Sequence, residues 1–519
     1  MINPAISVSQ PQAAASVLLI GGADPSGAGL QADWRVVHAL GMHAYSVTTA
    51  VTAQNNTEVS ELGVLPAWQV TAQLESVMQA LKQADAQPLA VIKVGMLGDE
   101  LVVAAVCEAI MQLREQGQSP RIIIDPVIAA SSGSRLLTEA GEQALREQLF
   151  PLADVITPNL NELAQLTGLP VSSVSEVETA VNALLDSGAT SVLLKGGHFN
   201  PERATSSDYF ASDSLRFWLM GTRWPERANV RGTGCLFATA IACASAQGYS
   251  VADAIVLAKT LVSRGIRQAV PVAGAYQARL GDVNPDDWSV EYQDFPLMTP
   301  QSPEAPRPEL ARCDTLRLGI YPVVDSVDWV EKLIDCGITT IQLRLKTDTD
   351  NPPSEQALDA QIQQAVSICK DRNIRLFIND HWQLAIKHGA YGIHLGQEDL
   401  YEADLQAIAN AGCRLGVSTH SYTEVARALW VNPSYIALGP IYATTSKAMP
   451  WVPQGAAAVE RWVKLLDGEY PLVAIGGINL ARAQALKATG IGSVAMISAI
   501  TKAPDYQAAT AELQAVWNS

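Results

Sequence analysis

A proline-rich segment divides the chain into two halves, and this division constrains the fold more than any other feature. The segment Pro296 to Pro308, PLMTPQSPEAPRP, holds five prolines in thirteen residues and has no apolar periodicity. Because proline lacks the N–H that helices and sheets use, we expect neither helix nor strand there. At 519 residues the chain is also too long for one compact core. We therefore predict a domain at residues 1–285, a linker at 286–315 and a second domain at 316–519.

In the first half, short apolar and β-branched runs alternate with amphipathic stretches. The runs are Ser16–Ile20, Tyr45–Thr52, Leu89–Val94, Arg121–Asp125, Val155–Thr157 and Ser191–Lys195. This alternation is typical of crossover units that build a parallel sheet with helices on both faces. We predict an open α/β sandwich for this half.

After the linker the alternation restarts, with eight strand-like runs in about 200 residues. They are Leu318–Val324, Thr339–Arg344, Leu376–Asn379, Gly392–Leu395, Leu415–Ser418, Tyr435–Leu438, Leu472–Ile475 and Ser493–Ile497. Eight such repeats predict a closed (β/α)₈ TIM barrel, in which the residues that follow the strands meet at one rim. Those residues are polar or glycine: Arg344, Asn379, Asp380, Gly396, Ser418, Gly439, Gly476 and Ser498.

The charge balance and the cysteines limit the partners and the compartment. With 35 Lys and Arg against 52 Asp and Glu, the net charge of −17 opposes non-specific binding to nucleic acid or to an anionic membrane. No apolar run reaches the roughly 18 residues of a membrane span, and no basic residue precedes Arg35 as a signal peptide would require. The seven cysteines are scattered and never spaced as CxxC, which argues against disulfides and zinc. We expect a cytoplasmic protein.

A glycine-rich turn follows the first predicted strand. It reads Gly21-Gly22-Ala23-Asp24-Pro25-Ser26-Gly27-Ala28-Gly29 and opens an amphipathic stretch, so backbone N–H groups can approach a small polar ligand. The turn also satisfies the GxGxxA pattern of dinucleotide-binding proteins. The acidic residue expected about 20 residues later is missing, which disfavours a dinucleotide.

A second glycine cluster precedes a helix of small residues, Leu236–Ala246. It reads Arg231-Gly232-Thr233-Gly234-Cys235 and gathers backbone amides at a helix N-terminus, which predicts an anion hole. Cys235 would lie in the first turn, where the helix dipole favours the thiolate. The alternative is that Cys235 is only a small packing residue, as we expect for Cys243.

The first 270 or so residues resemble hydroxymethylpyrimidine (phosphomethylpyrimidine) kinase, a member of the ribokinase-like superfamily. The stretches ADPSGAGLQAD, VTAQNNT, IKVGMLGD, IDPVI, ITPNLNE, LLKGGH and RGTGC carry the resemblance, in family order. It implies a kinase that uses Mg²⁺ and ATP. It also implies a pyrimidine site at Gly22, Asp33, Gln54, Met96 and Val127, and a nucleotide and phosphate site at Asn159, Glu162, Lys195, Gly232 and Gly234, with Lys195 and Cys235 catalytic.

Two departures from that family stand out. The first loop has one glycine fewer than the usual DPSGGAG, and Arg231 replaces a histidine before GTGC. We expect the shorter loop to weaken closure over the pyrimidine and Arg231 to add a cation beside the ATP phosphates. The alternative activity for this half is a pyridoxal-type kinase, which the same fold and glycine loops would serve.

In the second half, charged side chains gather at successive strand ends. Gln342, Arg344 and Lys346 alternate onto one face, which suggests a site for oxyanions. Asp380 and Asp399 follow the next two strands, and carboxylates there suit Mg²⁺ bridging a diphosphate. His381 and His394 lack ligand spacing, so we assign them no metal role and expect His394 to be a core or supporting residue.

The segment from about 316 to 515 resembles thiamine phosphate synthase, through QLRLK, ND, GQED, GVS, GPIYATTSK, IGGI and MIS in order. The resemblance implies that Gln342, Arg344, Lys346, Asn379, Ser418 and Lys447 bind pyrimidine diphosphate. It also implies that Thr444, Thr445, Ser446, Gly477, Ile497 and Ser498 bind thiazole phosphate, that Asp380 and Asp399 hold Mg²⁺, and that Ser418 and Lys447 are catalytic.

Together the two resemblances imply two linked steps of thiamine biosynthesis. The kinase would phosphorylate hydroxymethylpyrimidine and its monophosphate, and the synthase would couple the diphosphate to thiazole phosphate. Departing pyrophosphate leaves a cation that the aminopyrimidine stabilises, so the rim needs cations and metal but no general base. The alternative is a non-catalytic, ligand-binding or regulatory barrel. The sequence allows a homo-oligomer.

Overall fold

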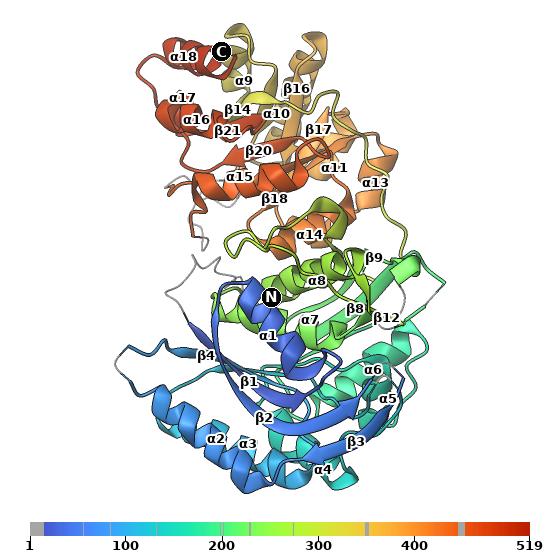
Figure 1. Ribbon diagram of the computed structural model, residues 1–519. Coiled ribbons are helices and arrows are strands. Elements are labelled where there is room, and N and C mark those ends of the chain that lie inside the picture. Colours follow the sequence, from blue (N-terminus) through green and yellow to red (C-terminus); the bar gives the residue numbers. More distant parts are fainter. Residues whose placement is uncertain are drawn as a thin grey trace. The chain divides into compact units, whose positions relative to one another are not determined.

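The apolar runs of the first half form the parallel centre of a ten-stranded sheet (Figure 1). The computed structural model describes residues 15–518, except 56, 84, 131, 198, 201, 228–229, 273, 348–351 and 445–451. The strand order is β13-β9-β8-β7-β6-β5-β4-β1-β2-β3. The six predicted strands are confirmed as β1 (Ser16–Ala23), β2 (His43–Gln54), β4 (Leu89–Val94), β5 (Arg121–Ile124), β6 (Val155–Ile156) and β7 (Ser191–Leu194), all paired in parallel.

Antiparallel strands extend this sheet at both edges. They are β3 (Val59–Val64) beside β2, and β8 (Thr205–Ser212), β9 (Arg216–Thr222) and β13 (Leu297–Thr299) beyond β7. A separate small sheet joins β10 (Val230–Arg231), β12 (Ala275–Gln277) and β11 (Val270–Val272). The edge strand β3 has one solvated face and so gives a weaker apolar signal than the central strands, whereas β8 and β9 are largely buried.

The expectation that the proline-rich segment contains no strand is wrong for its first residues. Leu297–Thr299 form β13, which pairs with Trp218–Met220 of β9, and Met298 and Thr299 are buried. An edge strand has hydrogen-bond partners on one side only, so nearby prolines do not prevent the pairing. The chain divides into two compact units between Ala305 and Pro306.

Helices cover both faces of the sheet of the first unit. On one face lie α1 (Gly29–Ala39), α7 (Thr233–Ala246) and α8 (Val251–Arg267); on the other lie α2 (Ala67–Ala80), α3 (Glu100–Glu115), α4 (Glu139–Ala144), α5 (Leu160–Thr167) and α6 (Val174–Leu185) (Figure 1). Helix α7 is made largely of small residues, which lets it pack closely against the central strands β4 and β5. This packing brings its N-terminus to the carboxyl ends of those strands.

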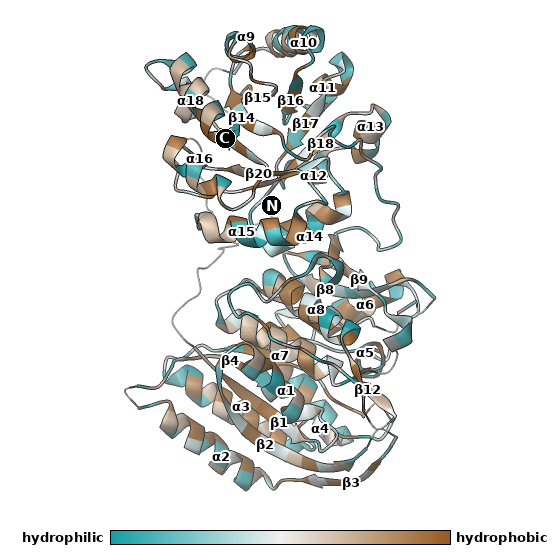
Figure 2. Cartoon of the chain, turned by 45° about the horizontal axis from the view of Figure 1, so that its top comes forward, coloured by the Kyte–Doolittle hydropathy of each residue, from teal (hydrophilic) through white to brown (hydrophobic). Residues whose placement is uncertain are grey.

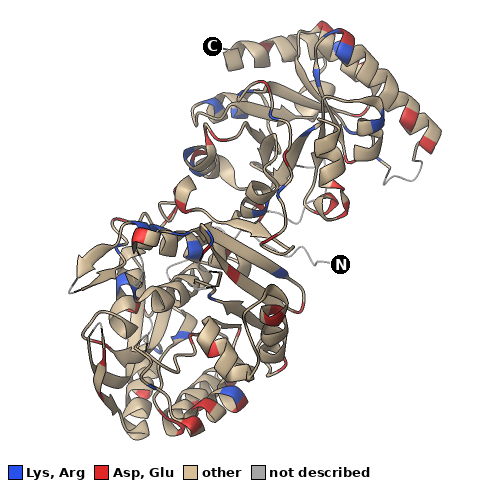
Figure 3. Ribbon diagram, turned by 90° about the vertical axis from the view of Figure 1, so that its right-hand side faces the viewer, with Lys and Arg blue, Asp and Glu red and all other residues tan. Residues whose placement is uncertain are grey.

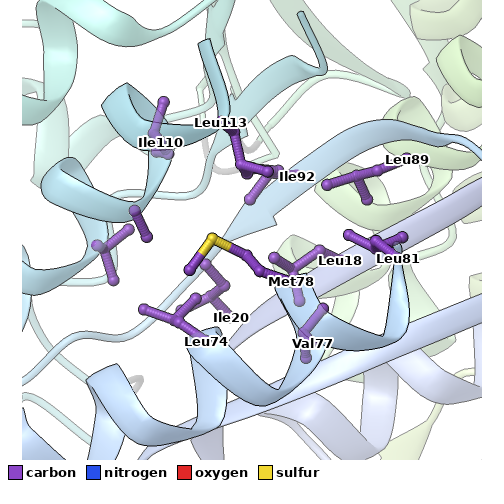
Figure 4. A pocket seen from close by; sticks show the side chains of 12 residues that line it. Leu18, Ile20, Leu74, Val77, Met78, Leu81, Leu89, Ile92, Ile110 and Leu113 are labelled. Atoms are coloured by element: carbon purple, nitrogen blue, oxygen red, sulfur yellow. The ribbon is translucent and has the colours of Figure 1, made fainter. Parts of the chain in front are cut away.

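Apolar side chains fill the space between the sheet and the helices. The strands are coloured as mainly hydrophobic in Figure 2. One small pocket lies between β1, β4, α2 and α3 and is lined by apolar side chains alone, among them Leu18, Leu74 and Ile110 (Figure 4). A gap without polar groups offers nothing to orient a ligand, so we regard it as part of the core.

The second unit is a closed barrel of eight parallel strands, as predicted. The strands are β14 (Gly319–Val324), β15 (Thr340–Leu343), β16 (Arg375–Asn379), β17 (Gly392–Leu395), β18 (Arg414–Thr419), β19 (Tyr435–Leu438), β20 (Leu472–Ile475) and β21 (Ser493–Met496), and β21 pairs with β14 to close the ring. Tyr321, Phe377 and Tyr435 fill the interior.

Each strand of the barrel is followed by one or two helices. They are α9 (Val327–Asp335), α10 (Glu355–Asp371), α11 (Trp382–His388), α12 (Asp399–Glu402), α13 (Leu405–Asn410), α14 (Tyr422–Val431), α15 (Gly455–Leu466), α16 (Leu480–Lys487), α17 (Ser498–Thr501) and α18 (Tyr506–Asn518). Acidic and basic residues are interspersed along the ribbon of both units (Figure 3). Among the described residues, no helix has the length and apolar character needed to cross a membrane.

Candidate functional site

The first glycine loop is shaped by contacts that only glycine permits. At Gly29 the φ angle is +54°, and a Cβ atom there would collide with the carbonyl oxygen of Gly22. Asp24 organises the turn, because its Oδ1 accepts hydrogen bonds from the amide and the hydroxyl of Ser26, each at 2.6 Å. The loop therefore turns tightly at the end of β1 and adds no side chain at Gly29, at the edge where the parallel strands end.

Several residues of the predicted pyrimidine site lie together beside this loop. A Cβ atom on Gly22 would lie 2.8 Å from the sulfur of Met96, so the two residues are in close contact. Val127 packs in the same small apolar cluster as Met96, and Gln54 ends the neighbouring strand β2 half-buried. This arrangement combines an apolar wall with one amide, which suits a flat aromatic ring with polar edges.

Asp33 has a different environment from the one predicted. Its side chain is fully enclosed; Oδ2 accepts a hydrogen bond from Lys93 Nζ at 2.8 Å and Oδ1 accepts one from Thr239 Oγ1 at 2.6 Å. Burial is the largest effect on the pKa of Asp33 and raises it, while Lys93 opposes the rise. With both oxygens engaged by the protein, we expect Asp33 to hold α1, β4 and α7 together and not to touch the pyrimidine.

A cavity of about 570 Å³ opens on the other side of the first loop. It is lined by Ala23, Gly27, Leu30, Gln31, Trp34, Arg35, Ser46, Thr48 and Gln277. None of the residues predicted to bind pyrimidine or nucleotide is in this set. The cavity is therefore separate from the cluster around Met96.

The predicted nucleotide residues gather at the ends of β5, β6 and β7. Asn159 caps α5, and its side chain and that of Glu162 form a reciprocal capping box. Asn159 also forms a backbone bridge with Lys195, so the β6 and β7 ends are adjacent. Burial raises the pKa of Glu162 to about 7, against the attraction of Lys195.

The motif-based assignment overlooked Asp125, which lies at the centre of this group. Asp125 follows β5 and its Oδ1 is 2.5 Å from Lys195 Nζ, with both side chains largely buried. Burial opposes the charge on Lys195, but Asp125 and Glu162 outweigh it and raise the pKa of Lys195. The motif IDPVI contains this carboxylate, and its place after a central strand was the signal that could have found it.

The second glycine cluster faces Lys195, as an anion hole requires. Gly232 has a φ of +75° and precedes α7, and a Cβ atom on Gly234 would lie 3.3 Å from Lys195 Nζ. The free N–H groups at the start of α7 and the ammonium group of Lys195 therefore converge on one volume.

Two expectations for this region need correction. Cys235 is half-exposed in the first turn of α7, but burial of its sulfur raises the pKa of the thiol to about 12. Burial thus opposes the effect of the helix dipole and favours the protonated thiol, a weak hydrogen-bond donor, over the thiolate that we expected. Arg231 donates to the carbonyl oxygen of Asn55 at 2.6 Å and lies 3.9 Å from Asp24, so it faces the pyrimidine side of the site.

In the barrel, the predicted residues lie at the carboxyl ends of the strands. Gln342 is buried within β15, Arg344 follows it half-buried, and Lys346 is exposed. Asn379 ends β16 beside His394 of β17, which places the two carboxylates that follow these strands at neighbouring positions of the rim.

The two carboxylates are shaped by local contacts. Asp380 has a positive φ of 64° and accepts a hydrogen bond from Asn379 Nδ2 at 2.5 Å. Asp399 accepts one from the amide of Gly396 at 3.1 Å. In the described part of the chain, no three or more His, Cys, Asp or Glu side chains form a group that could hold a metal ion by themselves. Two carboxylates completed by water and diphosphate oxygens still match the way proteins bind Mg²⁺.

The predicted thiazole phosphate residues lie after β20, β21 and β19. Gly477 has a φ of +62° and its carbonyl accepts a hydrogen bond from Arg482, and Ile497 and Ser498 begin α17 after the neighbouring strand β21. Thr444 is half-buried. Thr445, Ser446 and Lys447 lie outside the described residues. Backbone amides after these two strands commonly bind phosphate in this fold.

Both ring nitrogens of His394 lie within hydrogen-bond distance of other side chains. Its Nε2 lies 2.9 Å from Ser418 Oγ, and its Nδ1 lies 2.7 Å from the hydroxyl of Tyr435. The prediction that it is a core or supporting residue agrees with its 7% exposure. Its direct contact with Ser418 was not predicted.

Both halves of the chain are similar to known proteins. Residues 24–278 match the model of the phosphomethylpyrimidine kinase family, and residues 320–500 match that of the thiamine monophosphate synthase family. A thiamine-phosphate synthase of Pectobacterium atrosepticum is 53% identical over 216 residues, which are 42% of this chain and 96% of that protein. One of Serratia proteamaculans is 57% identical over 197 residues, 38% of this chain and 90% of that protein.

Solved structures of kinases are similar to the first half. A phosphomethylpyrimidine kinase of Clostridium difficile has 28% identity and a TM-score of 0.41, covering 49% of this chain and 99% of that one. A pyridoxal kinase of Staphylococcus aureus, in complex with AMP-PCP and pyridoxal, has 27% identity and a TM-score of 0.46, covering 53% and 96%.

Proposed function

Because this chain belongs to the thiamine-phosphate synthase family through its second half and carries a phosphomethylpyrimidine kinase domain in its first, we propose that it performs successive reactions on one pyrimidine. It is a bifunctional enzyme of thiamine biosynthesis. The kinase phosphorylates hydroxymethylpyrimidine and then its monophosphate with ATP. The synthase joins the resulting diphosphate to thiazole phosphate, which yields thiamine phosphate and pyrophosphate.

The observation that carries the kinase half of the proposal is the meeting of three elements around Lys195. Asp125, Glu162 and the start of α7 all face its ammonium group. Phosphoryl transfer needs alignment and charge neutralisation more than covalent help from the protein. Lys195 and the amides of Gly232 to Cys235 would neutralise the transferred phosphoryl group, and Asp125 and Glu162 would hold Lys195 and Mg²⁺–ATP.

The pyrimidine would lie beside this phosphate site. Met96, Val127 and Gly22 would contact its faces, and the amide of Gln54 would pair with its amino group and ring nitrogen. A pyridoxal ring has no amino group beside its ring nitrogen, and the family match of this half is to the pyrimidine kinase. We therefore favour the pyrimidine alcohol over pyridoxal as the substrate.

In the synthase half, residues at the barrel rim would stabilise the charges that develop as the diphosphate leaves. Arg344, Lys346 and Lys447 would neutralise the growing negative charge on the leaving group, while Gln342, Asn379 and Ser418 hold the pyrimidine diphosphate. The thiazole substrate would be held by Thr444, Thr445 and Ser446 and by phosphate contacts at Gly477, Ile497 and Ser498. Its nitrogen would capture the pyrimidine cation without a general base.

Asp380 and Asp399 would hold the Mg²⁺ of the synthase. When bound, the cation neutralises diphosphate charge, and hard carboxylate oxygens are the ligands it prefers. ATP supply and seven free cysteines both agree with a cytoplasmic enzyme, which is where we place it.

The test uses the full chain with hydroxymethylpyrimidine, thiazole phosphate, ATP and Mg²⁺, and measures pyrimidine monophosphate, diphosphate and thiamine phosphate. Replacing the pyrimidine with pyridoxal tests the alternative kinase substrate. Asp399→Ala is expected to abolish coupling and to leave pyrimidine phosphorylation unchanged. Glu402→Ala, an exposed carboxylate on the same helix, is the matched control and should retain both reactions. Coupling by Asp399→Ala at the wild-type rate would refute the metal assignment.

A further inference from the structure

A row of three residues across the barrel interior lets two distant polar side chains meet. His394 of β17 is in register with Gly416 of β18, and Gly416 is in register with Tyr435 of β19. Side chains in one register row point to the same side of the sheet, here the inside of the barrel. Because Gly416 has no side chain, the phenol of Tyr435 crosses above it and reaches His394.

The space over Gly416 is occupied by Tyr435 itself. A Cβ atom on Gly416 would overlap the phenol ring of Tyr435. The rings of His394 and Tyr435 are stacked, with centroids 5.7 Å apart and planes inclined by 18°. Glycine at 416 is therefore a requirement of the contact between His394 and Tyr435.

The contact extends into a chain of hydrogen bonds through the barrel. Tyr435 Oη lies 2.9 Å from Tyr321 Oη and 2.7 Å from His394 Nδ1, and His394 Nε2 lies 2.9 Å from Ser418 Oγ. Ser418 is two residues beyond Gly416 on β18, so it faces the same interior one layer nearer the rim. The chain thus leads from the barrel core to a residue of the proposed synthase site.

The protonation of the chain follows from its surroundings. Burial raises the pKa of both Tyr321 and Tyr435 far above the ordinary value, so both phenols keep their protons at neutral pH. A protonated phenol has one hydrogen to donate, and His394 Nδ1 accepts it when the histidine carries its own proton on Nε2.

We propose that Tyr321, Tyr435 and His394 are positioning residues that fix Ser418 as a hydrogen-bond donor toward the pyrimidine diphosphate. Tyr435 donates to Nδ1 of a neutral His394, whose Nε2–H donates to Ser418 Oγ. The hydroxyl proton of Ser418 then points to the rim, toward an acceptor atom of the substrate. The inference rests on the proposed function only in placing that substrate beside Ser418.

The kinetic test is a double-mutant cycle in the full chain. Tyr435→Phe keeps the ring and removes the hydroxyl, and it should lower kcat of coupling at least about tenfold, the size of effect expected when one preorganised donor is lost. The KM for thiazole phosphate should change less than about twofold, and pyrimidine phosphorylation should be unchanged. Ser418→Ala should cause a similar loss. Tyr391→Phe is the matched control, because the hydroxyl of Tyr391 contacts Asp314 and is not part of this series of hydrogen bonds.

The double variant shows whether Tyr435 acts through its hydrogen bonds to Ser418 or only stabilises the barrel. If Tyr435 acts through Ser418, Tyr435→Phe should add no further loss in the Ser418→Ala background. Additive losses, or Tyr435→Phe with wild-type coupling, would overturn the proposal. Histidine ¹⁵N spectra, assigned with His394→Asn, should show a neutral Nε2–H tautomer that changes in Tyr435→Phe. That spectrum is readable without turnover, so a wild-type enzyme that failed to couple would refute the proposed function while the spectrum still tested the chain. An Nδ1–H tautomer would overturn the proposed direction.

Discussion

A single buried ion pair joins three elements of the kinase unit. Burial opposes the charge on Lys93, but Asp33 outweighs it and holds the pKa of Lys93 above its ordinary value. Thr239, which supplies the third contact, lies one helical turn after Cys235 on α7. The pair therefore anchors the helix whose first turn forms the anion hole.

Lys93→Met should destabilise the first unit by about 3–5 kcal/mol, because it leaves Asp33 buried without its cation. Urea unfolding of the full chain measures this loss. Adding Asp33→Asn should recover part of it, since the uncompensated charge is then gone. Lys332→Met, which breaks an exposed pair with Asp328, should cause no measurable loss. Equal effects of the two lysine substitutions would contradict the role of burial.

The raised pKa of Glu162 predicts how the stability of the kinase unit depends on pH. Its pKa in the folded chain, about 7, is above the ordinary value of 4.5, so the folded state holds a proton that the unfolded state releases. Its contribution to stability is thus complete below pH 4.5 and is lost as the pH rises through 7. Glu162→Gln keeps the capping acceptor and removes the titration. The difference in melting temperature between wild type and this variant should shift against the wild type as the pH rises from 5 to 8. If the two plots of melting temperature against pH are parallel, the assignment is refuted.

At the scale of elements, turns with glycine shape both sites. Gly476 and Gly477 end β20 with positive φ angles of 106° and 62°, and a Cβ atom on Gly477 would collide with the carbonyl of Ala443. The turn after β20 and the loop after β19 are therefore packed backbone to backbone. The loop continues into Thr444 and the residues proposed to hold the thiazole substrate.

Gly477→Ala should raise the KM for thiazole phosphate about tenfold or more, because the added methyl group displaces that loop and strains the backbone. Steady-state coupling kinetics measure the change. Gly468→Ala is a control with a positive φ of 87° but no atom within 4 Å of its Cβ position, so it shares the backbone strain without the collision. An unchanged KM in Gly477→Ala would contradict the close packing.

At the scale of the whole molecule, the end of the predicted linker belongs to the barrel unit. Arg307 donates to the carbonyl oxygens of Trp430 and Leu429 at the end of α14, and Arg312 bonds Asn432. Asp314 forms a two-pronged ion pair with Arg375, both distances being 2.7 Å. The segment from 306 to 315 is thus bound to the barrel, which places the working boundary ten residues before the predicted 316.

A barrel fragment that begins at Pro306 should therefore be more stable than one that begins at Leu316. Loss of the helix-end contacts and the ion pair should lower the melting temperature by several degrees, since about 1 kcal/mol shifts a domain of this size by roughly 2–4 °C. Thermal unfolding of both fragments measures the difference. Equal melting temperatures would show that the segment adds nothing to the barrel.

The strands of both units were predictable from the sequence alone. Their apolar runs are local signals: β4, β17, β19 and β20 match the predicted ranges residue for residue. Most of the residues predicted from the motifs lie at the carboxyl ends of strands, because a parallel sheet or barrel places those ends at one edge. The antiparallel strands β3, β8, β9 and β13 were not predicted. β3 is half-solvated and lacks a continuous apolar run, whereas β9 is largely buried and its apolar residues 217–220 were a signal that could have found it.

Which side chains meet is known only from the three-dimensional structure. Lys93 and Asp33 are 60 residues apart, Lys195 and Asp125 are 70 apart, and Tyr435 and Tyr321 are 114 apart. Nothing local to either partner marks such a pair. The packing of α1 on the sheet determines the first pair, and the order of the strands determines the other two; the strand register explains why Gly416 leaves room for Tyr435. The protonated thiol of Cys235 has the same origin, because its pKa depends on enclosure by elements distant in the chain.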